Sequence, residues 1–297
     1  MSAHLVLVDA LNLVRRIYAV QERPFIQSKT QVESELAEKT QKQVLFNTQT
    51  ACIKALENIL ASQQPSHALA VFDSQQPCWR YKLYPDYKKG RKKMPVHLAG
   101  ELSNIQDAFM QHCVDSLVSE EDEADDLIAT LATKMALHNQ HVTIVSTDKG
   151  FLSLLSANIR IYDYFNRRYL DEQYVKNKFD VKPAQLIDLW TLTGDSTNKI
   201  PGVAGIGQIT AASLLNKYGS LSAIVNNEEI KPAILEKMNQ SKEQIALSRE
   251  LLTFKQNIPL GFNLKDIRLT NQNLELQESA RENTSLQIET NKNQQML

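Results

Sequence analysis

Carboxylate side chains follow three short apolar runs of this chain, at the point where each predicted strand ends. They are Asp9, Asp73 and Asp148. Ligands of an open parallel sheet collect beyond the carboxyl ends of its strands, so we expect these three side chains to converge. A predicted helix then opens with three more carboxylates, Glu123, Asp125 and Asp126. The sequence therefore predicts one strongly acidic pocket.

Several carboxylates in one pocket repel one another, and a hard divalent cation such as Mg²⁺ or Mn²⁺ relieves that repulsion. Two such ions about 4 Å apart activate a water and stabilise the leaving oxygen of a phosphodiester. Each aspartate taken alone has a plainer interpretation, because an Asp after a strand is often a helix N-cap or a turn residue. The six together favour metal-dependent phosphoryl transfer.

Basic residues concentrate in one segment although the net charge of the chain is only −1. Residues 80–93 contain seven lysines and arginines against one acid, Asp86, together with several tyrosines. Lysine and arginine neutralise phosphates, and tyrosine stacks on an unpaired base. A solvated charged loop is the alternative for this segment alone. Beside an acidic pocket, the segment suits a polyanionic substrate.

A glycine-rich turn at 194–207 leads into a helical segment at 208–215. Its glycines allow tight backbone turns, and the amides at the start of the next helix can meet a phosphate. This is the arrangement of a helix-hairpin-helix, which holds a DNA backbone independently of sequence. Carbonyl oxygens of such a turn can also surround a monovalent cation. Taken alone, the six-residue segment Gly-Val-Ala-Gly-Ile-Gly at 202–207 would more often be a structural turn.

Apolar runs alternate with segments of helical spacing up to about residue 180, which predicts a mostly parallel sheet flanked by helices. We expect strands at 4–8, 68–72, 114–118, 142–145 and 159–164, and an amphipathic helix at 45–60. The pattern after the boundary is helical. We predict a domain at 1–180 with a basic arch loop at about 75–97, a helical DNA-binding domain at 181–268, and a polar, disordered tail at 269–297.

The composition is that of an ordinary soluble protein, with 42% hydrophobic and 23% charged residues. Its three cysteines stand far apart, which indicates thiols in a reducing compartment. The N-terminus lacks the features of a signal peptide, and no apolar stretch reaches the length of a membrane span. We therefore expect a cytoplasmic, monomeric protein without a membrane partner.

The carboxylates, the basic segment and the turn occur in an order that resembles the 5′-nuclease family. That family includes bacteriophage 5′-nucleases, the 5′-nuclease domain of bacterial DNA polymerase I and the flap endonucleases. Six segments between residues 4 and 265 carry the resemblance: Val-Asp-Ala-Leu-Asn at 8–12, Val-Phe-Asp at 71–73, Tyr-Lys-x-x-Arg at 87–91, Glu-Ala-Asp-Asp at 123–126, Ser-Thr-Asp-Lys at 146–149, and Gly-Asp-Ser…Ile-Pro-Gly-Val-x-Gly-Ile-Gly at 194–207. The last two look most like a stand-alone bacterial subgroup.

The resemblance implies a PIN-like α/β nuclease domain followed by a helix-three-turn-helix region, and it implies roles for individual residues. Asp9, Asp73, Glu123, Asp125, Asp126 and Asp148 would surround a first metal, and Asp195 would belong to a second. Lys88 and Arg91 would lie by the scissile phosphate, with Tyr87 near an unpaired base. The K⁺ ligands would be the carbonyls of Leu192, Thr193, Pro201, Val203 and Ile206. Contacts to the DNA backbone would come from Gly205, Ile206, Gly207, Gln208, Ile209 and Thr210.

Three positions depart from the fuller family pattern, which has aspartates where this chain has Leu127, Gly150 and Asn198. All three lie at or near the second metal position. We therefore predict a Mg²⁺-dependent flap endonuclease, with Mn²⁺ as a substitute, that acts at 5′ flaps or single-strand/duplex junctions and has weak or no general exonuclease activity. Two alternatives stay open: a DNA-structure binding protein without chemistry, and a PIN-type ribonuclease.

Overall fold

Six strands form one sheet in the part of the chain that the computed structural model describes, residues 3–27, 38–74, 76–227 and 229–269. The sheet order is β3-β2-β1-β4-β5-β6, and all neighbouring strands are parallel except the last pair. The strands are β1 (His4–Asp9), β2 (His67–Phe72), β3 (Asp115–Val118), β4 (His141–Val145), β5 (Ile159–Asp163) and β6 (Arg168–Leu170).

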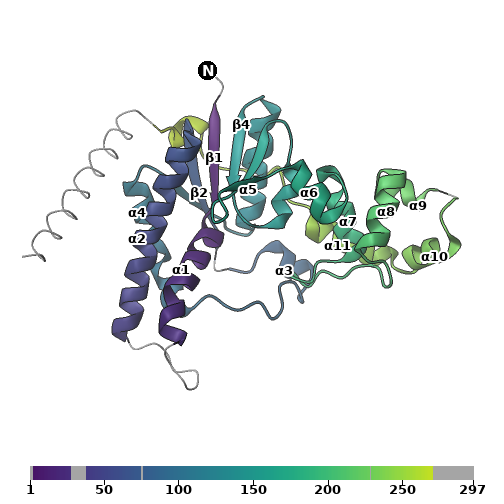
Figure 1. Cartoon of the computed structure of the whole chain (residues 1–297), viewed down its shortest axis with the longest axis horizontal. Helices are drawn as coiled ribbons and strands as arrows, with labels where there is room; N and C mark the ends of the chain where they lie inside the picture. Colours follow the sequence, from purple (N-terminus) through teal and green to yellow (C-terminus); the bar gives the residue numbers. More distant parts are fainter. Residues whose placement is uncertain (1–2, 28–37, 75, 228, 270–297) are drawn as a thin grey trace, which may run out of the picture.

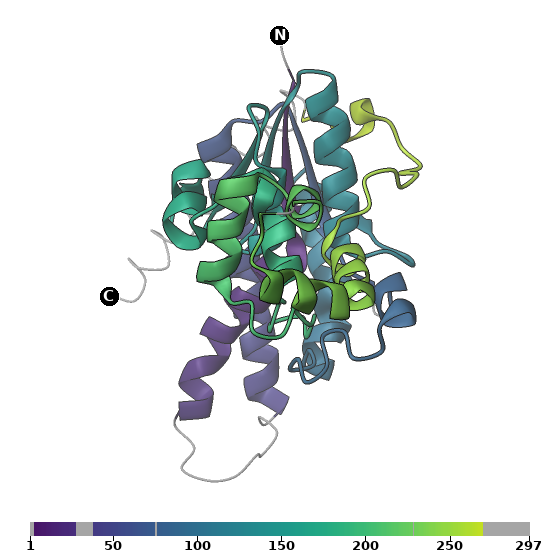
Figure 2. The same cartoon turned by 90° about the vertical axis from the view of Figure 1, so that its right-hand side faces the viewer.

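Helices cover both faces of this sheet, and a helical region adjoins it on one side (Figures 1 and 2). The α-helices are α1 (Ala10–Gln27), α2 (Glu38–Gln63), α3 (Trp79–Leu83), α4 (Val96–Gln111), α5 (Ala124–Leu137), α6 (Glu172–Phe179), α7 (Leu186–Thr193), α8 (Gln208–Tyr218), α9 (Leu221–Val225), α10 (Pro232–Gln240) and α11 (Lys242–Leu252). Three 3₁₀ segments, η1 (Lys149–Leu154), η2 (Pro183–Gln185) and η3 (Leu264–Ile267), complete the described elements. No described helix is long and apolar enough to cross a membrane.

The central strand shows why both faces are covered. Leu5 and Leu7 of β1 belong to the apolar cluster that includes α5, whereas Val6 and Val8 belong to the cluster that includes α1, α2 and α4. All four side chains are fully buried. Parallel sheets are stable only with both faces shielded, so the continuous apolar run of β1 is what this position requires.

The five expected strands are present, while the sequence did not indicate β6. This three-residue strand returns antiparallel to β5 and carries Arg168 and Tyr169, so it lacks an apolar run. Helix α2 also begins earlier than expected, at Glu38. The expected tail lies outside the described residues from position 270 onward, as do residues 28–37.

The helical region is organised around the turn between α7 and α8. Helix α11 packs against α7, and α8 follows the turn. Two glycines let the turn close on itself: a Cβ on Gly202 would lie 2.3 Å from the backbone nitrogen of Gly194, which itself has φ +76°. Only glycine permits so close an approach of two backbone segments.

Candidate functional site

Four of the six predicted carboxylates line one cleft with a volume of about 360 Å³: Asp9, Asp73, Asp125 and Asp148. Asp9 ends β1, while Asp73 and Asp148 follow the neighbouring strands β2 and β4. The carboxyl ends of these parallel strands share one edge of the sheet, and Asp125 joins them from the first turn of α5. The structure therefore brings these four carboxylates together at the edge where the sequence predicted that they converge.

Each of the three strand-end carboxylates also accepts hydrogen bonds of the kind that a helix cap or turn residue accepts. Asp73 Oδ1 accepts a hydrogen bond from the amide of Ala124 at 2.7 Å, and Asp148 Oδ1 accepts one from Gly150 at 2.7 Å. Asp9 accepts from the Ser146 hydroxyl at 2.6 Å and from the Asn12 amide at 3.3 Å. None of the ion pairs among the described residues includes a carboxylate of this cleft. These groups therefore orient the local backbone and still keep negative charge in the cleft.

Burial and mutual repulsion perturb the pKa values of these carboxyls. Burial raises the pKa of Asp9 to about 7; the Ser146 hydrogen bond opposes this rise, and the charges of Asp73 and Asp148 add to it. Burial, followed by the charges of Asp148, Asp9 and Asp73, holds the pKa of Asp125 well above its usual range. A bound cation would relieve this cost, so the donor set fits a hard divalent ion.

Among the described residues, no group of three or more His, Cys, Asp or Glu side chains is arranged as it stands to hold a metal ion. The carboxylates share a cleft and repel one another, but no three of them are positioned to coordinate one ion.

Asp126 lies apart from this cleft, which corrects its predicted position beside Asp125. Its carboxylate is fully buried and accepts two hydrogen bonds from the Arg80 guanidinium, at 2.7 and 2.8 Å. The Trp79 indole and the Lys255 amide donate to it at 3.0 Å each. Burial would raise the pKa of Asp126, but the Arg80 hydrogen bonds and charge outweigh burial and lower it. Adjacent helical positions point about 100° apart, and here the second one points to Arg80.

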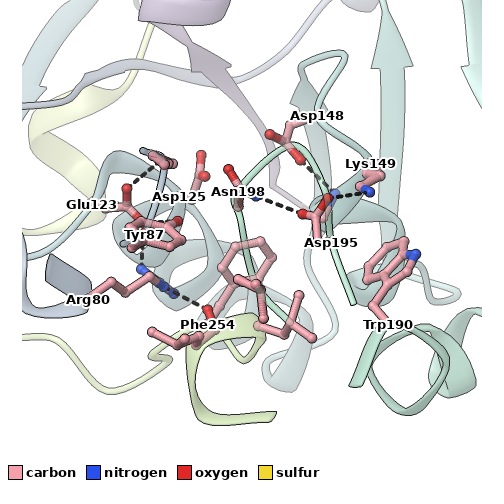
Figure 3. Close-up of a pocket in the computed structure, with 15 residues that line it drawn as sticks. Arg80, Tyr87, Glu123, Asp125, Asp148, Lys149, Trp190, Asp195, Asn198 and Phe254 are labelled. Atoms are coloured by element: carbon pink, nitrogen blue, oxygen red, sulfur yellow. Dashed lines mark hydrogen bonds and ion pairs between the residues drawn. The ribbon is translucent and has the colours of Figure 1, made fainter. Parts of the chain in front are cut away.

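The carboxylate of Glu123, the residue before α5, is likewise bound by neighbouring side chains of the protein (Figure 3). Arg80 donates to its Oε2 at 2.7 Å and the Tyr87 hydroxyl does so at 3.0 Å, while the Lys88 ammonium pairs with its Oε1. The Tyr87 ring is only 4% exposed, so it offers no open face to a base in this arrangement. Burial lowers the pKa of Lys88, but the Glu123 carboxylate outweighs burial and raises it.

The expected arch loop is thus anchored at its base. Cys78, Arg80 and Tyr87 are buried, and Arg80 also donates to the carbonyls of Leu251 at 2.8 Å and Thr253 at 3.2 Å. The segment also contains α3, and α4 begins at its end. A segment rich in Lys and Arg predicts solvent-exposed side chains, which is why the sequence did not indicate that Arg80 is buried.

Four cations face the carboxylates across the cleft. Lys88 and Arg91 line it as predicted, and Arg15 and Arg16 of α1 line it as well. Arg15 donates to the carbonyl of Lys92 at 2.8 Å, which ties α1 to the basic segment. The sequence contained a signal for both arginines: Asn12, Arg15 and Arg16 stand at helical spacing directly after Asp9.

Asp195 lies in a smaller pocket (Figure 3), and this pocket shares Asp125 and Asp148 with the cleft. It is 3% exposed, and its oxygens accept from the Lys149 ammonium at 2.8 Å and the Asn198 amide at 2.8 Å. The predicted second metal ligand is therefore paired with a lysine. Sequence reasoning missed Lys149 as its partner.

Gly150 stands where the resemblance implies a carboxylate, and its surroundings leave little room for one. A Cβ at this position would lie 2.9 Å from the Phe254 ring, which stacks on Phe151 with centroids 5.4 Å apart. The contacted atom belongs to a half-buried ring that packs against the core, so an aspartate here would have to displace that ring.

Two of the carbonyls predicted to bind K⁺ in this turn already accept hydrogen bonds from the protein. The Leu192 carbonyl accepts from the Val203 amide at 2.8 Å, and the Pro201 carbonyl accepts from the Ser248 hydroxyl at 2.7 Å. Beyond the turn, an exposed stretch at 207–210 forms the start of α8, with Ile209 88% exposed. These positions are open to a partner, whereas of the predicted K⁺ ligands Thr193 ends α7 and Ile206 is buried.

Sequence models of two domains match the chain in succession. The 5′-3′ exonuclease N-terminal resolvase-like domain matches residues 4–180, and the 5′-3′ exonuclease C-terminal SAM fold matches residues 181–275. The chain belongs to the 5′-3′ exonuclease family. The family predicted from the six sequence segments is therefore confirmed.

Curated relatives of this 5′-3′ exonuclease family protein match along nearly their whole length. Flap endonuclease Xni of Colwellia psychrerythraea is 70% identical over 270 residues, which is 91% of this chain and 93% of the relative. Flap endonuclease Xni of Aeromonas salmonicida is 45% identical over 268 residues, covering 89% of this chain and 96% of the relative. The predicted likeness to a stand-alone bacterial subgroup is confirmed.

Solved structures of low sequence identity show the same fold as this 5′-3′ exonuclease family protein. T5 5′-exonuclease with bound divalent metal ions (zinc) has a TM-score of 0.68 at 19% identity, covering 85% of this chain and 90% of that one. Bacteriophage T5 flap endonuclease in a pseudo-enzyme-product complex with DNA and metal ions has a TM-score of 0.64 at 20% identity, covering 84% and 88%. The predicted α/β domain followed by a helical region is confirmed.

Proposed function

We propose that this chain is a Mg²⁺-dependent flap endonuclease that hydrolyses DNA phosphodiesters near the base of 5′ single-stranded flaps. One observation carries the proposal: four carboxylates share a cleft with Lys88 and Arg91, and none of the four is neutralised by an ion pair among the described residues. The names of the curated relatives and the metal-bound structures of the same fold support it.

A divalent ion held by Asp9, Asp73, Asp125 and Asp148 would supply a nucleophilic water and offset charge on the phosphate. Of the residues of the chain itself, Lys88 and Arg91 face the same cleft and can neutralise charge that develops on the phosphate oxygens. Glu123 positions Lys88 through their ion pair, and Arg80 in turn positions Glu123. Asp126 then acts as the counter-ion of Arg80.

We propose weak or absent general exonuclease activity because the second metal position is occupied by protein contacts. Lys149 neutralises Asp195, and the Phe254 ring fills the space beside Gly150 where a further carboxylate would stand. Asn198 donates to Asp195 and so consumes one more acceptor. A second ion would have to displace all of these contacts.

DNA would be held at the turn between α7 and α8. Its exposed positions at the start of α8 present backbone amides to a phosphate, and K⁺ bound by turn carbonyls would add positive charge there. Mg²⁺ rather than Mn²⁺ as the working ion, the K⁺ site, a monomeric state and a cytoplasmic location all stay predictions.

A cleavage assay on a labelled 5′-flap duplex tests the proposal directly. We expect hydrolysis near the flap base with Mg²⁺ and none with a chelator. Asp125→Ala should abolish it, and Lys88→Ala should slow it by about 10²–10³-fold, the usual effect of removing one charge-stabilising donor. Lack of hydrolysis by the unaltered protein, or hydrolysis that Asp125→Ala leaves unchanged, would overturn the proposal.

A DNA-structure binding protein without chemistry is the second candidate, because no three described carboxylates are yet arranged around one point. Calorimetry with Mg²⁺ distinguishes the two. A nuclease should take up Mg²⁺ in a manner that Asp125→Ala abolishes, whereas a pure binder should bind flap DNA equally with and without the ion and leave it intact.

A further inference from the structure

The turn between β5 and β6 lies beside the cleft because of the sheet topology. Strand β5 pairs parallel with β4, so both strands end at the edge where the cleft carboxylates lie. The turn at 164–167 therefore stands two strands away from Asp9, a distance of about 10 Å across the sheet. Strand β6 then returns antiparallel along the outer edge.

This hairpin carries a surface of arginine and aromatic side chains, here called the hairpin surface. Its members are Arg160, Tyr162, Tyr164, Phe165, Arg167, Arg168 and Tyr169. The three arginines are exposed, and Tyr169 is 41% exposed. The Arg160 guanidinium lies 5.2 Å from the Tyr169 ring centroid, and the Tyr162 and Tyr169 rings lie 5.2 Å apart. The carboxylate of Asp163 is 5% exposed and accepts from Asn166 in the turn, so it stays beneath the surface.

One side chain makes the hairpin surface continuous with the cleft. Arg16 lines the cleft, and its guanidinium carbon lies 5.4 Å from the centroid of the Phe165 ring. A polyanion that leaves the cleft past Arg16 therefore meets Phe165 first and the arginines of the hairpin next.

Charge on an edge strand has a plainer explanation, since edge lysines and arginines prevent strands of different molecules from pairing. That explanation accounts for Arg167 and Arg168 alone. It does not account for the half-exposed aromatic rings beside them, because exposed apolar area favours association. Arginines interleaved with tyrosines match the chemistry that holds unpaired nucleotides: phosphate neutralisation and base stacking.

We propose that the hairpin surface binds a single-stranded segment of the DNA substrate as it leaves the cleft. This inference rests on the proposed function and names a further contact for the same substrate. The arginines would neutralise phosphates, and Tyr169, already flanked by Arg160 and Tyr162, would stack on a base.

Equilibrium binding in a chelator, where nothing is cut, tests this inference with the full chain. The probes are a fluorescent 5′-flap duplex and a blunt duplex of the same sequence, titrated at several salt concentrations. Arg167→Gln/Arg168→Gln should weaken flap binding and reduce the slope of log affinity against log salt by about 1.4, or 0.7 for each lost single-strand phosphate contact. Tyr169→Ala should weaken flap binding roughly 5- to 150-fold, the range for loss of one stacked base, while Tyr169→Phe should not.

Lys265→Ala serves as the matched control, because it removes one exposed charge at η3, which packs against β2 away from the hairpin. We expect it to change neither affinity nor slope. Unchanged flap affinity and slope in the Arg167→Gln/Arg168→Gln variant, with wild-type protein that cleaves flaps, would refute the hairpin contact and leave the proposed function standing. Equal weakening on the blunt duplex would refute its preference for single strands. Wild-type protein that cuts no flap would instead refute the proposed function.

Discussion

Replacing Arg80 with methionine is the most informative perturbation of this structure. The guanidinium is buried, with 1% of the residue exposed, and it donates to Glu123, to both oxygens of Asp126 and to two carbonyls near the end of α11. Methionine can follow the aliphatic part of the arginine side chain but carries no charge. The substitution therefore leaves the buried Asp126 carboxylate without its cation and leaves Glu123 with Lys88 alone.

The expected loss of stability follows from those contacts. Removing one partner of a buried ion pair costs about 3–5 kcal/mol, because the remaining charge is left without compensation. At about 2–4 °C per kcal/mol for a domain of this size, the melting temperature should fall by roughly 6–20 °C. Lys82→Met in the same helix is the control, since Lys82 makes only an exposed contact to Glu121 at 3.6 Å. Such pairs contribute about 0–1 kcal/mol.

The loss should also depend on pH with a definite sign. Arg80 lowers the pKa of Asp126, so its contribution is present above the unfolded pKa of about 3.9 and disappears as pH falls through the lowered folded value. Without Arg80, burial raises the pKa of Asp126 instead. The variant then carries its full penalty at neutral pH and escapes part of it by protonation in acid.

Urea unfolding of the wild type and of both variants at pH 7.5 and pH 5 measures these differences. A free energy loss for Arg80→Met below about 1 kcal/mol at pH 7.5, or one that grows between pH 7.5 and pH 5, would refute the reasoning. Flap cleavage by Arg80→Met should fall as well, because Arg80 positions Glu123 and through it Lys88.

Three further predictions concern the turn, the cleft and the second metal position. Gly202→Ala should unfold at a lower temperature, because its Cβ would lie 2.3 Å from backbone atoms, whereas Gly100→Ala has nothing within 4 Å and should stabilise α4 by roughly 0.5–1 kcal/mol; thermal melts check both. Burial raises the pKa of Asp9 to about 7, so metal-free protein should lose stability as pH rises through that value, and the increase in melting temperature caused by Mg²⁺ should be larger at pH 8 than at pH 6. Lys149→Met should leave the carboxylate of Asp195, which is 3% exposed, buried without its cation, so calorimetry should detect either additional Mg²⁺ uptake or a loss of stability of about 3–5 kcal/mol. If the variant shows neither effect, the assigned pairing of Lys149 with Asp195 is wrong.

The sheet and most of the acidic cleft could be predicted from sequence because both depend on local patterns. Apolar runs specify buried parallel strands, and parallel strands bring their carboxyl ends to one edge. The positions of Asp9, Asp73 and Asp148 in the cleft follow from these two patterns alone. Strand β6 escaped prediction because its pairing partner, not its own composition, makes it a strand.

Arg80 and Asp126 could not be predicted because their environment comes from distant parts of the chain. The carbonyls that Arg80 contacts belong to Leu251 and Thr253, more than 170 residues away. A motif places Asp126 beside Asp125, but helix geometry and a buried cation decide which way each carboxylate points. Lys149 is a similar case, since its partner Asp195 lies 46 residues further along the chain, in the helical region.

One backbone contact joins the basic segment to the turn between α7 and α8. The amide of Lys88, whose φ is +53°, donates to the carbonyl of Asn198 at 2.9 Å. The backbone conformation of each segment therefore depends on the other. A chimera that takes either segment alone from a relative would lose the hydrogen bond between Lys88 and Asn198. Evolution within the family would have to alter them as a matched pair.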